Sequence, residues 1–500
     1  MDPAARRFDG RLWIALLALV LAFGFLGSRP VWDPDEGRYS NVALNMLESG
    51  DWLHPMRSHE AGHWTKPPLT YWSVASSVAV FGYTPFAARL PVALAYLACV
   101  FMVWRMARRL VPQRPGLAPV VFATMALPAS AAQLLTTDFI LTACVTAAMW
   151  AYVELRFGDG RHRRGWSLLL WGAFGLGFLT KGPPALLPLL AVLAVQWATP
   201  ADRRPALGLA LGLPLFAVLA FGWFAAVVIG RPDLLRYFVG EEVVERVAGH
   251  GFDRNAGPFG WLLVYGPTLL LGSLPWTRTW LRWLRAAPQR LRGWRDGDAA
   301  QAVDRFLLAW IALPLLVLCL ASSRLPLYVL PLFVPIALAI ARQGAQDGLR
   351  LRPVWLAVWV LLLLGLRVLA ANHDTHKDAG AWAEAIRSRV DGPVAEVVFI
   401  DDMARYGLHL HLGAEVEKVT VEGGHAPRQS DGFDHDLARE LDEHEAHVVY
   451  VTKREHFPKV LPVLQAHGMA PQTLGPDLYG RVLFTVQPHA DAARRRPAVP

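Results

Sequence analysis

Cysteine and charged residues are both scarce in this chain of 500 residues. The three cysteines, Cys99, Cys144 and Cys319, all lie in apolar runs, which excludes a disulfide framework and a cysteine-rich metal site. Charged residues make up 18% of the chain, and apolar residues make up 54%. One soluble core could not bury that many apolar residues. The sequence also lacks a glycine-rich loop of the kind that holds nucleotide phosphates, so we expect no nucleotide substrate.

Apolar segments instead predict an α-helical polytopic membrane protein with about 11–13 transmembrane helices. The first segment follows several arginines and lacks a convincing cleavage site, so we interpret it as a retained signal-anchor helix. The eleven predicted crossings lie near residues 12–27, 89–104, 117–134, 139–155, 166–180, 183–198, 206–229, 258–275, 303–321, 325–341 and 353–371.

Arginine-rich loops set the predicted orientation, because short loops rich in Lys and Arg stay in the cytoplasm. A cytoplasmic N-terminus puts every strongly basic loop on the inner side of a bacterial inner membrane, provided that residues 68–83 form an interfacial helix and do not cross. The basic loops are 105–114, 156–164, 203–204, 278–295 and 342–352.

An acidic cluster, Asp33-Pro34-Asp35-Glu36-Gly37-Arg38-Tyr39, directly follows the first apolar helix and falls on the outer face. Ionised carboxylates at a membrane surface are costly and usually functional. Arg38 would share a helix face with Asp35, three residues before it. The loop that begins here, residues 28–67, ends at Lys66-Pro67-Pro68.

The same orientation brings further polar residues to the outer surface, and each has an ordinary explanation. Asp138 or Thr137 could be a helix N-cap, Lys181 a snorkelling lysine, and Arg324 and Tyr328 interfacial anchors. The full set is Asp35, Glu36, Arg38, Lys66, Asp138, Lys181, Arg324 and Tyr328.

A sugar carried on a polyprenyl phosphate would give this set a common purpose. Its phosphate is a good leaving group at headgroup depth, so cations there would bind it and no general acid is needed. A carboxylate would act as base on an acceptor hydroxyl, and Asp35 is the best candidate.

The run from Pro34 to Trp52 resembles the first outer loop of the lipid A aminoarabinose transferases. These are C-type (GT-C) glycosyltransferases, to which the protein O-mannosyltransferases are more distantly related. The likeness continues through Lys66-Pro67-Pro68-Leu69-Thr70-Tyr71-Trp72, Phe81-Gly82, Arg89-Leu90-Pro91, Thr137-Asp138, Leu179-Thr180-Lys181-Gly182 and Ser323-Arg324-Leu325-Pro326-Leu327-Tyr328-Val329-Leu330-Pro331.

This resemblance implies that Asp35 is the catalytic carboxylate, with Asp138 and the adjacent Glu36 as further acidic candidates. It implies donor phosphate contacts for Arg38, Lys66, Lys181, Arg324 and Tyr328. Two departures stand out: the family commonly has Glu where this chain has Thr65, and Lys where it has Arg324. The first puts in doubt a metal site at that position and the aminoarabinose specificity.

His59-Glu60-Ala61-Gly62-His63 matches the H-E-x-x-H signature of zinc metalloproteases, which needs both histidines on one face of a helix. Gly62 and the prolines that follow argue against that helix. A divalent metal ion remains a candidate cofactor, with Asp35, Asp138, His59 and His63 as its candidate ligands.

Residues 372–488 predict a soluble periplasmic α/β domain, with 19 acidic residues against 11 Lys and Arg. The expected elements are a helix at 379–390, strands at 394–400 and 448–451, a helix at 456–467 and a strand at 480–486. Residues 489–500 are expected to be a disordered tail.

The sequence therefore predicts a membrane glycosyltransferase in residues 1–371 with an accessory domain. Its partners would be a polyprenyl-phosphate-linked sugar, a lipid A-type glycolipid or a protein acceptor, and membrane lipids, but not nucleic acid. Transfer to protein or another glycan stays open. A lipid or solute transporter is the alternative of a different class, which would place charges near the bilayer midplane.

Overall fold

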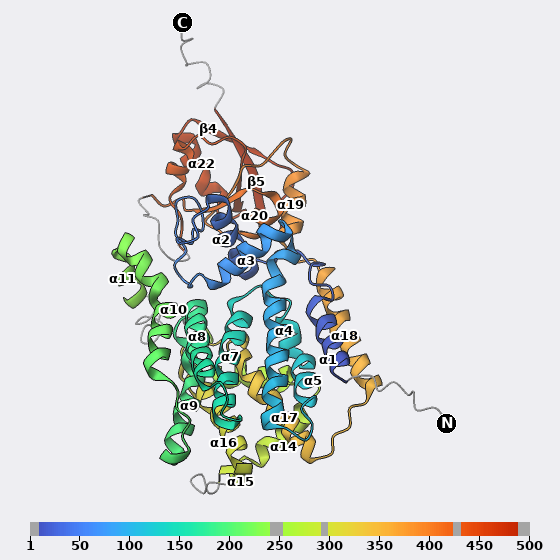
Figure 1. Ribbon diagram of the computed structural model, residues 1–500. Coiled ribbons are helices and arrows are strands. Elements are labelled where there is room, and N and C mark those ends of the chain that lie inside the picture. The colour runs from blue at the N-terminus through green and yellow to red at the C-terminus, as the bar shows by residue number, and fades with distance from the viewer. Residues whose placement is uncertain (1–9, 241–253, 292–298, 424–431, 489–500) are drawn as a thin grey trace. The chain divides into compact units, whose positions relative to one another are not determined.

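The computed structural model describes residues 10–240, 254–291, 299–423 and 432–488 (Figure 1). The chain divides into two compact units. The first, which we call the helical unit, contains Met1–Leu26, Lys66–Thr70 and Arg89–Leu369; the second, the mixed unit, contains Gly27–Thr65, Tyr71–Ala88 and Ala370–Pro500. The predicted tail at 489–500 lies outside the described residues.

Long helices of the helical unit run alongside one another (Figure 1). Each of the eleven predicted crossings contains at least one helix of the structure. The elements are α1 (Gly10–Phe23), α4 (Pro85–Leu110), α5 (Leu117–Thr124), α6 (Ala126–Ala131), α7 (Thr137–Phe157), α8 (Arg163–Lys181), η1 (Pro183–Leu186), α9 (Leu187–Ala198), η2 (Ala201–Arg203), α10 (Leu209–Gly230), α11 (Asp233–Arg236), α13 (Gly260–Gly272), α14 (Thr277–Arg285), α15 (Ala287–Leu291), α16 (Ala299–Leu320), η4 (Pro326–Leu332), α17 (Phe333–Gln346) and α18 (Pro353–Ala371).

Six of the described helices are long and apolar enough to cross a membrane. Four shorter apolar helices accompany them, of which Leu69–Phe81, or α3, is the predicted interfacial helix. The six are Pro85–Leu110, Thr137–Phe157, Leu209–Gly230, Gln301–Leu320, Pro326–Gln346 and Pro353–Ala371.

The apolar segment 117–134, predicted as one crossing, is instead broken between α5 and α6, where Met125 is extended. Pro128 explains the break, because proline has no N–H and its ring clashes with the carbonyl four residues earlier, here that of Thr124. Trp359 Nε1 donates a hydrogen bond to that carbonyl at 2.7 Å, and Tyr96 Oη donates to the carbonyl of Ala123 at 2.9 Å. The freed backbone groups therefore have partners.

Arg367 of α18 joins three segments of the helical unit. Its guanidinium donates hydrogen bonds to the carbonyls of Leu21 and Gly24, at the end of α1, and to that of Ala129 in α6. Carbonyls at a helix C-terminus have no partner within the helix and carry partial negative charge. This cation therefore acts as a helix cap between packed helices.

The mixed unit contains a five-stranded sheet of order β2-β1-β3-β5-β4. The first three strands are parallel, and the pairs β3 with β5 and β5 with β4 are antiparallel. The elements are α2 (Asp35–Ser49), α3 (Leu69–Phe81), α19 (Ala379–Arg387), β1 (Glu396–Ile400), α20 (Gly407–Leu412), β2 (Glu415–Val419), α21 (Leu437–Asp442), β3 (Val448–Lys453), α22 (Phe457–Ala466), β4 (Met469–Thr473) and β5 (Arg481–Pro488).

Alternating side chains of the strands build two cores, one on each face of the sheet. Val397 and Phe399 of β1 pack with Trp382 of α19, whereas Val398 and Ile400 pack on the other face with helices α21 and α22. Successive side chains of a strand point to opposite faces, so a run of five buried residues fills both cores. The three predicted strands and two predicted helices of this domain are present. Strands β2 and β4 were not predicted.

The first outer loop packs against this α/β domain within the mixed unit, whereas the sequence analysis had grouped it with the membrane helices. Helices α2 and α20 lie against each other through two glycines. A Cβ on Gly37 of α2 would meet the backbone nitrogen of Gly407, the first residue of α20, at 2.5 Å. Only glycine permits this approach, which gives α2 a fixed position on the domain.

Candidate functional site

Three carboxylates at the start of α2 have different environments. Asp33 is buried, and both of its oxygens accept a hydrogen bond from the backbone N–H of Gly407, at 3.2 and 3.3 Å. Burial away from water raises the pKa of its carboxyl to about 7, although the bond from Gly407 works in the opposite direction. Asp33 therefore holds the loop to the α/β domain.

Glu36 is also buried. Its Oε2 lies 2.7 Å from Arg29 Nη2 and accepts a hydrogen bond from the backbone N–H of Trp32 at 2.9 Å. This carboxylate satisfies an N–H group at the beginning of the helix and neutralises a buried arginine. The geometry argues for a structural role and against Glu36 as a catalytic residue.

Asp35 is the exposed member of the three, with 64% of its side chain accessible to solvent. It occupies the first turn of α2, where the helix dipole favours an anion. Arg38 Nη2 lies 3.2 Å from Asp35 Oδ1, as the three-residue spacing predicts. A carboxylate that is oriented and still accessible suits a general base.

Asp138, Lys181 and Tyr328 meet in the helical unit although their elements are far apart in the sequence. Lys181 Nζ lies 2.5 Å from Asp138 Oδ1 and 4.5 Å from the centroid of the Tyr328 ring. Both ionised side chains are largely buried. The N-cap of α7 is Thr136, whose hydroxyl accepts the N–H of Asp138, so neither Asp138 nor Thr137 is the cap considered from the sequence.

Arg324 is buried, and its guanidinium donates to the carbonyls of Asn255 at 2.8 Å, Gly257 at 3.1 Å and Cys319 at 3.1 Å. These bonds use much of its donor capacity to hold the segment before α13. Lys66 is half-buried in the turn before α3.

The H-E-x-x-H segment is not helical. Residues 57–60 form bends, and an isolated bridge pairs Met56 with Gly62. The two histidines have different neighbours. His63 Nε2 lies 2.9 Å from Thr65 Oγ1, whereas His59 Nδ1 lies 2.9 Å from Glu415 Oε1. The segment therefore lacks the helix that a metalloprotease site requires, so His59 and His63 do not share a helix face.

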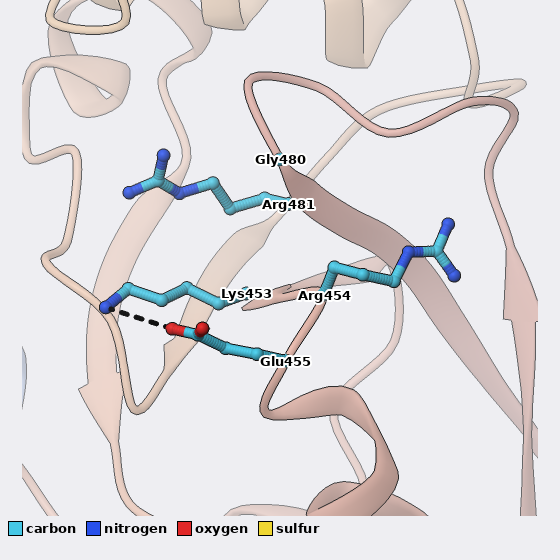
Figure 2. Close-up of a pocket in the computed structure, with 5 residues that line it drawn as sticks. All are labelled: Lys453, Arg454, Glu455, Gly480 and Arg481. Atoms are coloured by element: carbon cyan, nitrogen blue, oxygen red, sulfur yellow. Dashed lines mark ion pairs between the residues drawn. The ribbon is translucent and has the colours of Figure 1, made fainter.

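A pocket of about 410 Å³ opens on the α/β domain where β3 ends and β5 begins (Figure 2). Its lining is rich in cations, but these already have carboxylate partners. Arg481 pairs with Asp402 at 2.9 Å, Arg454 points away from the other two and pairs with Asp477, and Lys453 lies 4.0 Å from Glu455. The pocket does not form a strong anion site.

The structure thus places the predicted residues in two groups, with Asp35 and Arg38 in the mixed unit and Asp138, Lys181, Arg324 and Tyr328 in the helical unit. Asp33 was missed as the residue that anchors the loop. Glu417 of β2 was missed as well, although it is fully buried. Glutamates alternating with valine usually indicate a strand with a solvated face, so nothing in the sequence pattern marked Glu417 as buried.

Comparison with known proteins gives a family match over residues 65–221, to a model described as dolichyl-phosphate-mannose-protein mannosyltransferase. Two curated relatives are named undecaprenyl phosphate-α-4-amino-4-deoxy-L-arabinose arabinosyl transferase. The one from Edwardsiella ictaluri is 33% identical over 379 residues, which are 73% of this chain and 65% of the relative. The one from Aeromonas salmonicida is 32% identical over 384 residues, which are 72% of this chain and 67% of the relative.

The solved structure of ArnT from Cupriavidus metallidurans bound to undecaprenyl phosphate has a similar fold, with a TM-score of 0.75 and 21% identity. The match covers 95% of this chain and 97% of that one. By sequence, the chain spans about two thirds or less of the length of the curated relatives it matches, from 59 to 67% in five of them.

Proposed function

Since the chain belongs to the family of undecaprenyl phosphate-aminoarabinose transferases, we propose that it transfers 4-amino-4-deoxy-L-arabinose from undecaprenyl phosphate to a lipid A-type acceptor. The assignment of the site rests on the observation that the carboxylate of Asp35 is exposed. Asp33 and Glu36 lie within two residues of it, and both are buried and bound to protein groups. Asp35 is therefore the member of this cluster that a substrate can reach.

Lys181 is the proposed ligand of the donor phosphate. Asp138 and the Tyr328 ring hold its ammonium group in place at the ends of three helices. An ammonium oriented in this way can bind a phosphate oxygen and stabilise the charge that develops as the phosphate leaves. Lys66 and Arg38 are further cations proposed for the donor, and Arg324 is proposed to shape the site through its backbone contacts.

In the proposed reaction the acceptor oxygen bonds to the anomeric carbon of the sugar while the bond from that carbon to the phosphate oxygen breaks. The bonding electron pair leaves with undecaprenyl phosphate. Where the acceptor is a hydroxyl, its proton passes to Asp35. A single displacement of this kind inverts the configuration of the anomeric carbon.

The chain is a multi-pass protein of the bacterial inner membrane. We place its N-terminus in the cytoplasm and the mixed unit in the periplasm. The arginine-rich loops, which this orientation gathers on the inner side, support that placement. Both groups of site residues then belong to the outer face.

A protein acceptor is the second candidate, favoured by the mannosyltransferase family match over residues 65–221. The relatives named as transferases do not favour the transporter considered from the sequence. The reaction chemistry would be the same for either acceptor, since a hydroxyl of serine or threonine also requires a base.

Mass spectrometry of lipid A and envelope proteins tests the proposal in cells with the intact chain, a deletion, Asp35→Asn or Asp391→Asn at matched expression. Asp391 is an exposed residue of the α/β domain and serves as the control. We expect the mass of one aminopentose unit on lipid A to disappear with the deletion and to fall about 10²- to 10⁴-fold in Asp35→Asn.

Asp391→Asn should keep the full product. An aminopentose found on protein instead would replace the acceptor assignment, and full product from Asp35→Asn would refute Asp35 as the base. If the deletion changed no glycoconjugate, the proposed activity itself would be wrong.

A further inference from the structure

Side chains from three segments of the mixed unit converge beside the edge strand β2. His59 and Glu60 come from the first outer loop, Glu417 from β2, and His435 and Glu440 from the region of α21. One ligand atom each of Glu417, His435 and Glu440 lie within 4.8 Å of one another, and the same holds for His59, Glu415 and Glu417. Glu417 belongs to both sets, so it is the centre of the cluster.

Burial sets this cluster apart from an ordinary acidic surface. The exposed fractions of Glu417, His435 and Glu440 are 0%, 1% and 4%. Among the described residues, no hydrogen bond reaches either carboxylate oxygen of Glu417 or His435 Nδ1. A buried carboxylate without hydrogen bonds costs several kcal/mol unless it is protonated or binds a cation. The cationic neighbours of Glu417 are the imidazoles of His59 at 3.2 Å and His435 at 3.7 Å, so its buried carboxylate depends on these ion pairs or on a bound cation.

Distances within the cluster match those between the ligands of one metal ion. Bonds of about 2.0–2.1 Å in a tetrahedral zinc site place neighbouring ligand atoms about 3.3 Å apart. His435 Nε2 lies 2.9 Å from Glu440 Oε2 and 3.7 Å from Glu417 Oε2, and His59 Nδ1 lies 3.2 Å from Glu417 Oε1. Glu417 thus turns Oε2 toward His435 and Oε1 toward His59, so its carboxylate faces both histidines.

Glu60 occupies the position of a supporting carboxylate. Its Oε2 lies 3.2 Å from His435 Nδ1, the ring nitrogen that faces away from Glu417 and Glu440. Histidines that bind metal commonly donate the other N–H to a carboxylate, which fixes the tautomer and orients the ring. Arg439 pairs with Glu60 and would hold that carboxylate in turn.

Charge in this region also favours a cation. Glu396 on the adjacent strand β1 is buried, and residues 372–488 carry 19 acidic residues against 11 Lys and Arg.

We propose that Glu417, His435, Glu440 and His59 bind one divalent transition-metal cation, Zn²⁺ being the probe of that class, with Glu60 orienting His435. Imidazole and carboxylate groups are ligands that zinc accepts. The cation would link the first outer loop, which carries Asp35, to β2 and α21 of the α/β domain. The inference stands apart from the transferase activity, because it concerns how the mixed unit is held together.

Metal content of the full chain in nanodiscs is the direct test, after purification through a tag that binds no metal, stripping with chelator and dialysis against Zn²⁺. We expect one zinc per chain by mass spectrometry of the metal. Loading with Co²⁺ should give the visible absorption of a tetrahedral site. Wild-type protein without saturable zinc binding would overturn the proposal and leave a protonated hydrogen-bond network in its place.

Variants locate the cation. Glu417→Gln should abolish binding, Glu60→Gln should weaken it about 10- to 100-fold, and Glu455→Gln, an exposed residue of the same domain, should bind as the wild type does. His59→Asn changes a half-exposed side chain, so it provides a variant that folds if Glu417→Gln does not. Wild-type affinity in both Glu417→Gln and His59→Asn would place the zinc elsewhere and overturn the assignment.

Thermal unfolding gives a readout that is independent of activity. Zn²⁺ should raise the Tm of the wild type and of Glu455→Gln, because a ligand that binds the folded state stabilises it. Zn²⁺ should raise the Tm of His59→Asn by less than it raises the Tm of the wild type. An equal rise in all three proteins would contradict the proposed ligands.

Discussion

Arg57 and Asp434 form a fully buried ion pair although they are 377 positions apart in the chain. Arg57 Nε donates to Asp434 Oδ1 at 3.1 Å, and Asp434 Oδ2 accepts the N–H of Lys418 at 2.8 Å. The pair lies within the mixed unit, so one arginine of the outer loop is held by a carboxylate that also binds the backbone of β2.

Arg57→Ala should destabilise the mixed unit by about 3–5 kcal/mol, because it leaves the carboxylate of Asp434 buried without its partner. The Tm in detergent and the rate of limited proteolysis measure this effect. The double variant Arg57→Met with Asp434→Asn should recover part of the loss, since it leaves no unpaired charge. A single variant as stable as the wild type would show that the pair contributes little.

Lys181→Met should reduce transfer about 10- to 150-fold, since a hydrogen bond to a charged group contributes about 1.5–3 kcal/mol and about 1.4 kcal/mol corresponds to tenfold in rate. Rates with a purified lipid-phosphate donor give the measurement. Lys459→Met, at an exposed lysine of the α/β domain, is the control. Unchanged rates in Lys181→Met would remove Lys181 from the donor site.

Asp33 should make the protein less stable as the pH rises from about 4 to about 7. Its raised pKa means that the folded state keeps a proton in this range while the unfolded chain, with a value of 3.8, has released it. Stability from this group is fully present below the unfolded value and is lost as the pH passes through the folded one. Asp33→Asn should flatten this part of the profile of Tm against pH.

Asp391→Asn controls for the loss of one carboxylate elsewhere in the domain, and its Tm profile should match that of the wild type. The same slope in Asp33→Asn as in the wild type would show that Asp33 is not the group responsible.

Arg367→Met should destabilise the helical unit, since three carbonyl groups of α1 and α6 lose a charged donor. Each such bond contributes about 1.5–3 kcal/mol. The Tm in nanodiscs should fall, whereas Arg350→Met, at an exposed arginine before α18, should have little effect. If Arg367→Met kept the Tm of the wild type, lipid or water would have to replace the arginine at these carbonyls.

Strands β1, β3 and β5 could be predicted because their apolar residues reveal them directly. Strand β2 could not, since its Glu417 looks like a residue of a solvated face and becomes buried only when His59 and His435 pack over it. The N-cap of α7 was placed one or two residues late for a related reason. Thr136, Thr137 and Asp138 are all good caps, and the ion pair with Lys181 commits Asp138 elsewhere.

The sequence by itself determined the membrane class, the positions of the long apolar helices and Asp35 as a candidate base, because run length, periodicity and a local motif are properties of neighbouring residues. The short helices α14, α15, α20 and α21 were not predicted. Only the tertiary structure decided which carboxylates are accessible and which are buried. Asp33, Asp35 and Glu36 lie within four residues, yet Asp33 and Glu36 are buried, with Gly407 and Arg29 as their partners, and Asp35 is exposed. Gly407 is 374 positions from Asp33 in the chain, so no local pattern records that contact.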